Sequence, residues 1–312
     1  MDKLEAGIDV AAFPQFRDMN QMFLTSFEGI EKLNEGYLET ASLTLKPGQD
    51  HLPEVAAIQR NAARIHAEKG SPFQLRVCIT GPYTLASFFP HRTSQIYLKL
   101  GKVLSMIVAK NIFAVRHGKV ALITLDEPLF GLIDDPLIDK GVEGRENLLL
   151  TWEMLTSEAK RKNVETSLHL HSTSDDLFWS VGSLRIVESH VDDPLYRMPT
   201  TKRLLDKEDK SLKASIAITD FDQLIKTKIG LAASEDTIVN AWRKILSGTL
   251  NPAAFLESID VMKKRLLKII RRFGMERVAF GGPECGLRGF PTYTSAISCL
   301  NKVSKTVRSV NY

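Results

Sequence analysis

Short runs of apolar and β-branched residues alternate with long amphipathic segments along the whole chain. Seven of these runs are predicted to be strands. Most of them are apolar at nearly every position, which is typical of parallel strands buried on both faces of a sheet. The predicted strands are Gly7–Ala12, Gln74–Thr80, Lys119–Leu125, Thr166–Ser172, Ser183–Ser189, Lys213–Thr219 and Arg277–Gly282.

The segments between the strands carry apolar residues at helical spacing. The predicted helices are Ala56–Gly70, Ser94–Val115, Gly144–Lys162, Ser234–Leu246 and Pro252–Phe273. Gly70 is a C-cap signal, and Asn251 is an N-cap signal with a proline at the first helical position after it.

Strands that alternate with helices predict βαβ units and a parallel sheet. We therefore expect an α/β fold of the TIM (β/α)8 type. Such a barrel needs eight strands, and the pattern supplies seven, so the first strand is expected to be missing or rearranged. No linker rich in Gly, Ser or Pro divides the 312 residues, and we predict a single barrel domain over residues 1–312.

Composition narrows the class of protein. Hydrophobic residues make up 44% and charged residues 25%, as in ordinary globular proteins. The 41 Lys and Arg against 37 Asp and Glu give a net charge of only +4, so we expect no nucleic-acid partner. No uninterrupted apolar stretch is long enough for a membrane helix, and we expect no membrane association. Three cysteines suit a reducing compartment, and we predict a cytoplasmic protein.

Polar residues recur where the predicted strands end. In a barrel the carboxyl ends of the strands hold the functional site. Polar residues scattered over the surface would not recur at the same end of six strands. The strand-end groups are Thr80–Thr84, Asp126–Pro128, His169–His171, Glu188–His190, Thr219–Asp222 and Pro283–Gly286.

Four of these residues form a candidate zinc set. On a strand, His169 and His171 point to the same face. With Glu188 and Cys285 they would make a tetrahedral set of imidazole, carboxylate and thiolate ligands. Each has an ordinary alternative: a His pair satisfied by other contacts, a salt bridge from Glu188 to a barrel Arg or Lys, and a small buried apolar role for Cys285. That last role fits Cys78 and Cys299 well.

Two pairs of carboxylates follow other strands. Asp126 and Glu127 alternate, so only one of them is expected to face the barrel axis. A carboxylate there could bind an ammonium group or transfer a proton. The alternative is capping of the next segment, and the same two interpretations apply to Asp220 and Asp222.

These residues occur in motifs that resemble the catalytic barrel of the cobalamin-independent methionine synthase family, within the zinc methyltransferase and uroporphyrinogen-decarboxylase-like barrels. The closest likeness is to short, single-barrel members of archaeal type. The motifs stand in family order and cover nearly the whole chain. They are ITGPYTLA (Ile79–Ala86), ITLDEPLF (Ile123–Phe130), HLHS (His169–Ser172), IVES (Ile186–Ser189) and GGPECGL (Gly281–Leu287).

The resemblance implies a zinc ion held by His169, His171, Glu188 and Cys285. The family has a cysteine where His171 stands. An imidazole there removes one negative charge, which would make zinc a stronger Lewis acid and a bound thiolate less nucleophilic. Asp126 matches the carboxylate that holds the amino group of homocysteine.

Other matches are less direct. Glu127 lies beside Asp126 and is a second substrate-binding candidate. Asp222 falls where the family has a catalytic histidine, and we assign it a catalytic role together with Asp126. Gln15 stands where long members place a glutamate against the substrate amine. The family's first strand has no counterpart before the segment Leu4–Met19.

The resemblance implies methyl transfer to the thiol of homocysteine, which yields methionine. The short chain favours a methyl-corrinoid donor, brought by a corrinoid protein, or a methyl-pterin donor. Two alternatives remain. One is methyl transfer to another thiol such as coenzyme M. The other is a zinc-binding barrel without catalysis, which the replaced cysteine, the replaced histidine and the absent strand favour.

Overall fold

The computed structural model describes residues 1–230 and 234–310. The chain forms two compact units. The larger unit comprises Val10–Ser189 and Asp193–Ser211. The smaller unit comprises Met1–Asp9, His190–Asp192 and Leu212–Tyr312. A single domain over residues 1–312 stays a prediction.

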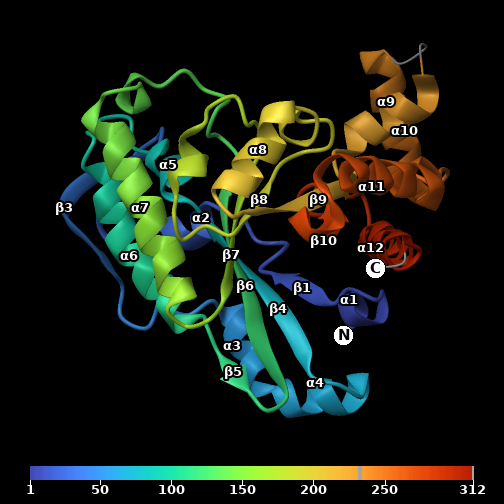
Figure 1. Ribbon diagram of the computed structural model, residues 1–312, viewed down its shortest axis with the longest axis horizontal. Helices are drawn as coiled ribbons and strands as arrows, with labels where there is room; N and C mark the ends of the chain where they lie inside the picture. Colours follow the sequence, from blue (N-terminus) through green and yellow to red (C-terminus); the bar gives the residue numbers. More distant parts are fainter. Residues whose placement is uncertain (231–233, 311–312) are drawn as a thin grey trace. The chain divides into compact units, whose positions relative to one another are not determined.

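A parallel sheet runs through the larger unit in the order in which its strands occur along the chain (Figure 1). Adjacent strands are separated in sequence by helices, which is the βαβ arrangement that the pattern predicts. A short strand, β5, pairs antiparallel with β6 at its start. The strands are β1 (Val10–Phe13), β4 (Phe73–Thr80), β5 (Ala114–Val115), β6 (Gly118–Glu127), β7 (Glu165–Leu170) and β8 (Ile186–Glu188).

Helix α6 (Ile96–Lys110) buries an apolar stripe. In α6 the buried residues Leu100, Val103, Leu104 and Ile107 recur at helical spacing. Gly101 lets α6 approach α7 closely, because a Cβ atom there would lie 2.7 Å from Cγ2 of Thr151. The helices are α2 (Gln21–Leu24), α3 (Pro53–Arg60), α4 (Ala62–Lys69), α5 (Pro82–Ala86), α6 (Ile96–Lys110), α7 (Glu143–Lys160) and α8 (Pro199–Lys207), with 3-10 turns at Pro136–Ile138, Leu177–Ser180 and Pro194–Tyr196.

The smaller unit contains two parallel strands, β9 (Ser211–Ala217, whose first residue belongs to the larger unit) and β10 (Val278–Pro283). Every residue of β9 is buried. The first helix packs against the last, and the Tyr293 hydroxyl donates a hydrogen bond of 2.6 Å to Asp2. The helices are α1 (Asp2–Glu5), α9 (Phe221–Ile229), α10 (Glu235–Leu246), α11 (Ile259–Phe273) and α12 (Tyr293–Arg308), with 3-10 turns at Pro252–Phe255 and Met275–Arg277.

All seven predicted strands are present, with ends that shift by a few residues, but three helix predictions need correction. The helix predicted over Ala56–Gly70 is interrupted at Asn61, whose side chain donates to the Ala57 carbonyl at 2.8 Å. Gly70 ends α4 in the left-handed conformation, as predicted. The helix predicted to reach Val115 ends at Lys110, because Asn111 caps the Ile107 carbonyl.

The third correction concerns residues 252–273. Asn251 caps and Pro252 begins only a 3-10 turn, and α11 starts anew at Ile259 behind a second cap, Ser258. An antiparallel hairpin formed by β2 (Phe27–Lys32) and β3 (Tyr37–Leu45) was not predicted from the sequence. Most positions of β3 are exposed or half-buried, so it lacks the apolar run that marks the other strands. No helix among the described residues is long and apolar enough to cross a membrane.

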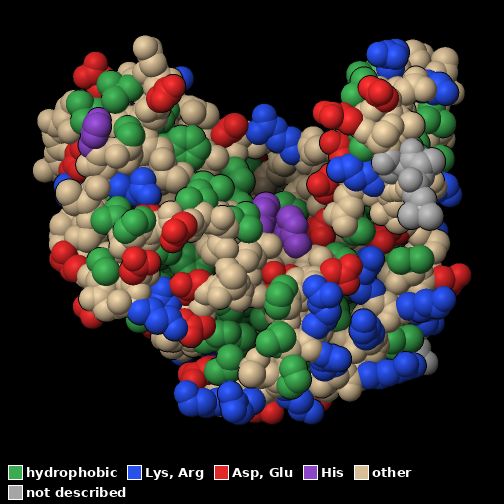
Figure 2. All heavy atoms as spheres, turned by 90° about the horizontal axis from the view of Figure 1, so that it is seen from above, with side chains coloured by type: hydrophobic (Ala, Val, Ile, Leu, Met, Phe, Trp, Pro, Cys, Tyr) green, Lys and Arg blue, Asp and Glu red, His purple; other side chains and the backbone are tan. Residues whose placement is uncertain are grey.

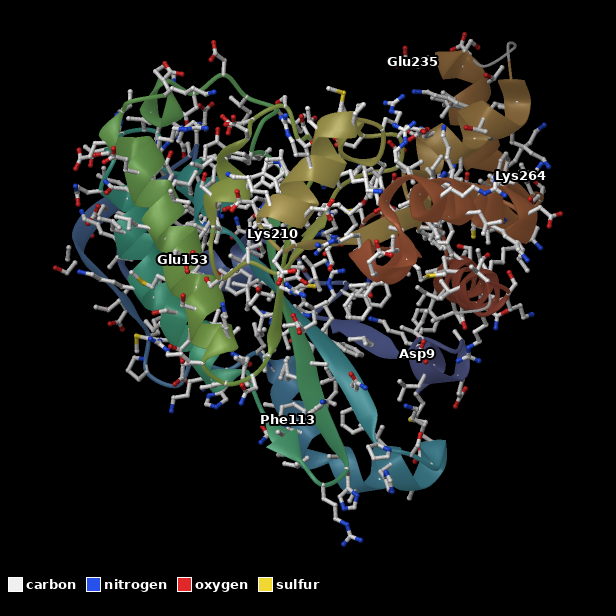
Figure 3. The ribbon with its side chains drawn as sticks, viewed as in Figure 1. Asp9, Phe113, Glu153, Lys210, Glu235 and Lys264 are labelled. Atoms are coloured by element: carbon white, nitrogen blue, oxygen red, sulfur yellow. The ribbon has the colours of Figure 1, made fainter. Side chains whose placement is uncertain are left out.

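Two charged side chains fix the turn that leads into β8. Lys210 is almost fully buried, and its ammonium group donates to the carbonyls of Val181 and Leu184 at 2.6 and 3.1 Å. Burial lowers the pKa of Lys210. Glu153, on α7, accepts a hydrogen bond of 3.2 Å from the Ser183 amide of the same turn. Figure 3 labels both residues. They set where β8 begins and therefore where Glu188 lies.

Glu127 fixes the start of α5. Its carboxylate is fully buried and accepts hydrogen bonds from the Tyr83 and Thr84 amides at 3.0 and 2.7 Å, and from the Trp152 indole at 2.8 Å. Desolvation by burial raises the pKa of Glu127 to about 7, against the lowering effect of these donors. One carboxylate thus ties β6 to α5 and α7.

We predict that titration of Glu127 makes the unfolding free energy depend on pH. Because the pKa is raised on folding, the folded chain holds this proton more tightly than the unfolded chain does. Its contribution is fully present below pH about 4.5 and is lost as the pH rises through about 7. Urea unfolding of the wild type at pH 5 and pH 8 should show this loss, on the order of 3 kcal/mol. The Glu127→Gln variant should lack it, and equal pH dependence in both proteins would contradict the assignment.

Candidate functional site

A row of polar side chains crosses the sheet of the larger unit at the carboxyl ends of four strands. Thr80 of β4 is in register with Asp126 of β6, Asp126 with His169 of β7, and His169 with Glu188 of β8. Residues paired in register across parallel strands point to the same face. These four residues therefore stand at one level. The sequence predicts such a level over six strands, and these are the four of them that belong to the larger unit.

Glu188 forms a buried ion pair with Arg76, which lies four residues before Thr80 on β4. The two guanidinium nitrogens approach the two carboxylate oxygens, at 2.8 Å (Nη2 to Oε1) and 3.1 Å (Nη1 to Oε2). The Glu188 side chain is fully buried and that of Arg76 is 14% exposed. The salt bridge that the sequence offered as the alternative role of Glu188 is present.

A second polar layer lies below the row and supports the same carboxylate. Ser167 of β7 donates to Oε1 of Glu188 at 3.0 Å. The Ser167 and Thr124 hydroxyls lie 2.6 Å apart across β6 and β7. The Ser167 hydroxyl thus supplies a hydrogen bond that a buried carboxylate otherwise takes from water, and Thr124 contacts that hydroxyl.

Arg76 also approaches Asp126. Its Nη2 lies 3.9 Å from Oδ1 of Asp126, whose side chain is 18% exposed. Asp126 is thus the member of the Asp126–Glu127 pair that faces the row, while Glu127 points to α5 and α7. Only one of the two faces the row, as the alternation predicts. Substrate binding by Asp126 and Glu127 stays a prediction.

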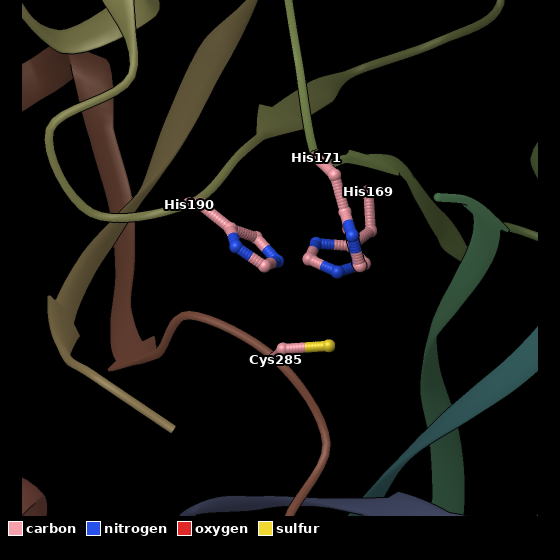
Figure 4. Close-up of side chains that lie close together, drawn as sticks. All are labelled: His169, His171, His190 and Cys285. Atoms are coloured by element: carbon pink, nitrogen blue, oxygen red, sulfur yellow. The ribbon is translucent and has the colours of Figure 1, made fainter. Parts of the chain in front are cut away.

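His169 and His171 lie next to each other, with ring centroids 5.3 Å apart (Figure 4). Each offers a ring nitrogen, and the two nitrogens are within 4.8 Å of one another. His169 is buried, with Nδ1 3.8 Å from Oε2 of Glu188. The predicted strand ran to Ser172, but β7 ends at Leu170, so His171 projects from the loop rather than from the strand.

The smaller unit holds a second pair of side chains, Cys285 and His190, that could bind a metal ion. Cys285 follows β10 by two residues, and its sulfur lies within 4.8 Å of a ring nitrogen of His190 (Figure 4). Glu284 holds the segments of Cys285 and His190 in place. Its buried carboxylate accepts hydrogen bonds from the Thr219 and Val191 amides at 2.8 and 2.9 Å. Cys285 and His190 are half-buried. Figure 2 shows histidine side chains at the molecular surface.

The sequence reading did not select His190 or Arg76. The signal for His190 was its place two residues after Glu188, in the same strand-end group. The signal for Arg76 was a single cation at the centre of an apolar strand, which requires a buried anion.

Of the other two cysteines, Cys299 is buried, as predicted, while Cys78 is half-buried. Desolvation by burial raises the pKa of the Cys78 and Cys299 thiols to about 12. A thiol with a raised pKa stays neutral at physiological pH.

The remaining predicted residues lie at other positions. Asp220 caps α9 by accepting from the Gln223 amide at 3.1 Å, which confirms its capping alternative. Asp222 lies in the first turn of that helix and accepts from the Trp242 indole at 2.6 Å. Gln15 follows β1 by two residues and is half-buried. The catalytic role of Asp222 and the substrate contact of Gln15 stay predictions.

No family model and no curated protein matches the sequence. Among solved structures, the chain is similar to a B12-independent methionine synthase from Shewanella sp. W3-18-1 in complex with selenomethionine. The TM-score is 0.62 and the sequence identity 13%, and the similarity covers 99% of this chain and 85% of that chain. At this identity the similarity shows the fold alone. The α/β fold of the TIM-barrel type is confirmed.

We predict that Arg76 and Glu188 are strongly coupled in stability. Arg76→Met should lower the unfolding free energy by about 3–5 kcal/mol, because it leaves a buried carboxylate without its cation. The double variant Arg76→Met/Glu188→Leu removes both charges and should regain most of that loss. Urea unfolding of the wild type, both single variants and the double variant measures the coupling. Additive losses would contradict the buried pair.

Proposed function

We propose that this protein is a zinc-dependent methyltransferase that transfers a methyl group to the thiol of homocysteine and forms methionine. The observation that carries the proposal is the row at the strand ends of the larger unit. It sets two adjacent imidazoles beside Asp126, a carboxylate suited to an ammonium group. The barrel fold shared with a methionine synthase supports it.

The donor set fits zinc. As the resemblance implies, the proposed zinc ligands are His169, His171, Glu188 and Cys285. Imidazole and thiolate ligands favour zinc over Mg²⁺ or Ca²⁺. Ligands of a tetrahedral zinc lie about 3.4 Å apart, given metal–ligand bonds of about 2.1 Å. The separation within each pair, at most 4.8 Å, needs only small side-chain rotations to meet this value.

Bound zinc would lower the pKa of a substrate thiol, so that the thiolate forms at neutral pH. Asp126 would hold the ammonium group of homocysteine at the mouth of the row and orient the thiol. The guanidinium of Arg76 lies 3.9 Å from the Asp126 carboxylate. The reducing cytoplasm that the sequence predicts would keep Cys285 available as a thiolate ligand.

A methyl-corrinoid, carried by a corrinoid protein, or a methyl-pterin is the proposed donor. The assay therefore offers methylcobalamin and a methyl-pterin, each with homocysteine and with coenzyme M. Transfer to homocysteine supports the proposal. Transfer to coenzyme M alone would assign the site to another thiol, and no transfer by zinc-loaded protein would show a barrel without catalysis.

We predict one zinc ion per chain in protein purified without chelator. Cys285→Ser replaces a soft thiolate by a neutral hydroxyl and should lower zinc affinity at least tenfold. Metal analysis after dialysis against a weak chelator measures this change. The matched control is Cys299→Ala, which removes a buried cysteine of the same unit from α12 and should retain the full zinc content. Full retention by Cys285→Ser would exclude that cysteine as a ligand.

We predict that Asp126→Asn lowers kcat/KM for homocysteine about 10- to 100-fold, because a hydrogen bond to a charged group contributes about 1.5–3 kcal/mol. The loss should be much smaller with coenzyme M, which has no ammonium group. Asp236→Asn, at an exposed carboxylate of α10, is the control for surface charge and should leave the rate unchanged. Equal losses with both thiols would contradict an ammonium contact.

A further inference from the structure

We propose that the exposed face of helix α11, in the smaller unit, binds an acidic helical segment of another protein. Four cationic side chains on this face, which we call the basic stripe, would contact the carboxylates of that partner. They are Lys264, Lys268, Arg271 and Arg272. This contact needs neither zinc nor methyl transfer, so it adds a binding partner to the proposed function without depending on it.

The basic stripe lies on the side of α11 that faces away from the core of the smaller unit. Lys268, Arg271 and Arg272 follow Lys264 by four, seven and eight residues, and this spacing places the four side chains on one face of a helix. The opposite face holds the buried side chains Met262, Leu266, Ile269 and Phe273. All four members of the stripe are exposed, and Figure 3 labels Lys264. Burial of the apolar face therefore directs the four charges towards solvent.

No member of the basic stripe makes an ion pair or a side-chain hydrogen bond within residues 1–230 and 234–310. By contrast, Arg265 of the same helix pairs with Glu257 at 2.8 Å. The sequence supplies no local anion, because no acidic residue occurs between Asp260 and Glu276. Six Lys and Arg minus one Asp give α11 a net charge of +5, against +4 for the whole chain. Positive charge is thus concentrated on this one helix.

Like charges are neighbours within the basic stripe. Lys268 lies four residues from both Lys264 and Arg272, and three residues from Arg271. Like-charge pairs at these spacings destabilise a helix. A surface that places carboxylates between the cations would replace this repulsion by attraction. The charge pattern of α11 therefore fits an anionic partner.

The dimensions of the stripe fit an acidic helix. Positions four residues apart lie about 6 Å apart along a helix axis, and glutamates at every fourth position of a partner helix repeat at the same distance. Arg271 and Arg272 can each bind a carboxylate through two parallel hydrogen bonds. Val261 and Met275, 44% and 36% exposed, lie just before and just after the stripe in the chain and offer apolar contacts at its ends.

Two other anionic partners fit the stripe less well. Proteins that bind single-stranded nucleic acid stack bases on aromatic side chains, and the only aromatic residue of α11, Phe273, is buried. Helices that lie on membranes insert an apolar face into the lipid. The apolar face of α11 is buried in the protein, and cations occupy the centre of its exposed face. An acidic helix requires neither an exposed aromatic residue nor an exposed apolar face.

Fluorescence anisotropy with the full-length protein tests this surface. The probe is a fluorescein-labelled, alanine-based helical peptide with glutamate at every fourth position, and the comparison peptide has glutamine at those positions. We expect the glutamate peptide to bind about tenfold more tightly, and its affinity to fall as the salt concentration rises from about 50 to 200 mM. Equal affinities for the two peptides would overturn the proposal.

Lys268→Glu/Arg272→Glu should weaken binding of the glutamate peptide about tenfold, because two attractive contacts become repulsive. Both side chains are exposed, so the fold should be retained, which circular dichroism checks. The matched control is Lys202→Glu/Arg203→Glu, which makes the same change in net charge at two exposed residues of α8 in the larger unit. The control should bind the peptide as the wild type does. Equal weakening in both variants would show a response to net charge alone and would overturn the assignment to α11.

The same titration with an RNA oligonucleotide and with vesicles that contain phosphatidylserine distinguishes the other anionic partners. We expect both to bind more weakly than the glutamate peptide. Tighter binding of either one would assign the stripe to phosphate groups and would overturn the acidic protein partner.

Discussion

The buried pair between Arg76 and Glu188 is the interaction on which the rest of the polar row depends. Two opposite charges leave water together on the inner strands of a sheet, and their desolvation is offset only because both guanidinium nitrogens and both carboxylate oxygens engage. The pair joins β4 to β8 across the two strands between them. It also sets the electrostatics on either side, with a cation near Asp126 and an anion near His169.

Three other buried charged side chains hold loops in place through hydrogen bonds to the backbone. Glu127 binds the first amides of α5, Glu284 binds the amides of Thr219 and Val191, and Lys210 binds two carbonyls in the turn before β8. Each satisfies backbone groups that would otherwise be buried without partners. The side chains with candidate chemistry stand next to these fixed points, which set their positions.

The predicted strands were accurate where a strand is buried on both faces, because such a strand must be apolar nearly throughout. They missed the hairpin of β2 and β3, whose side chains are largely exposed and carry no such run. Helix ends were less accurate. Asn61, Asn111 and Ser258 hydrogen-bond to the backbone and interrupt or restart helices, and these local bonds compete with a periodicity that continues past them.

The sequence by itself determined the α/β class, the order of the strands and the level at which polar residues collect. These features follow from the side-chain period of two residues in strands and 3.6 residues in helices, which can be recognised within short segments. It also identified His169, His171, Asp126 and Cys285 as residues of interest.

Only the tertiary structure decided which side chains contact one another. Arg76 and Glu188 are 112 residues apart in the chain, and the sequence offered both a metal ion and an ion pair for Glu188. In the folded sheet the ion pair forms, because the register of the strands places the Arg76 guanidinium beside the buried Glu188 carboxylate, which has no contact with water.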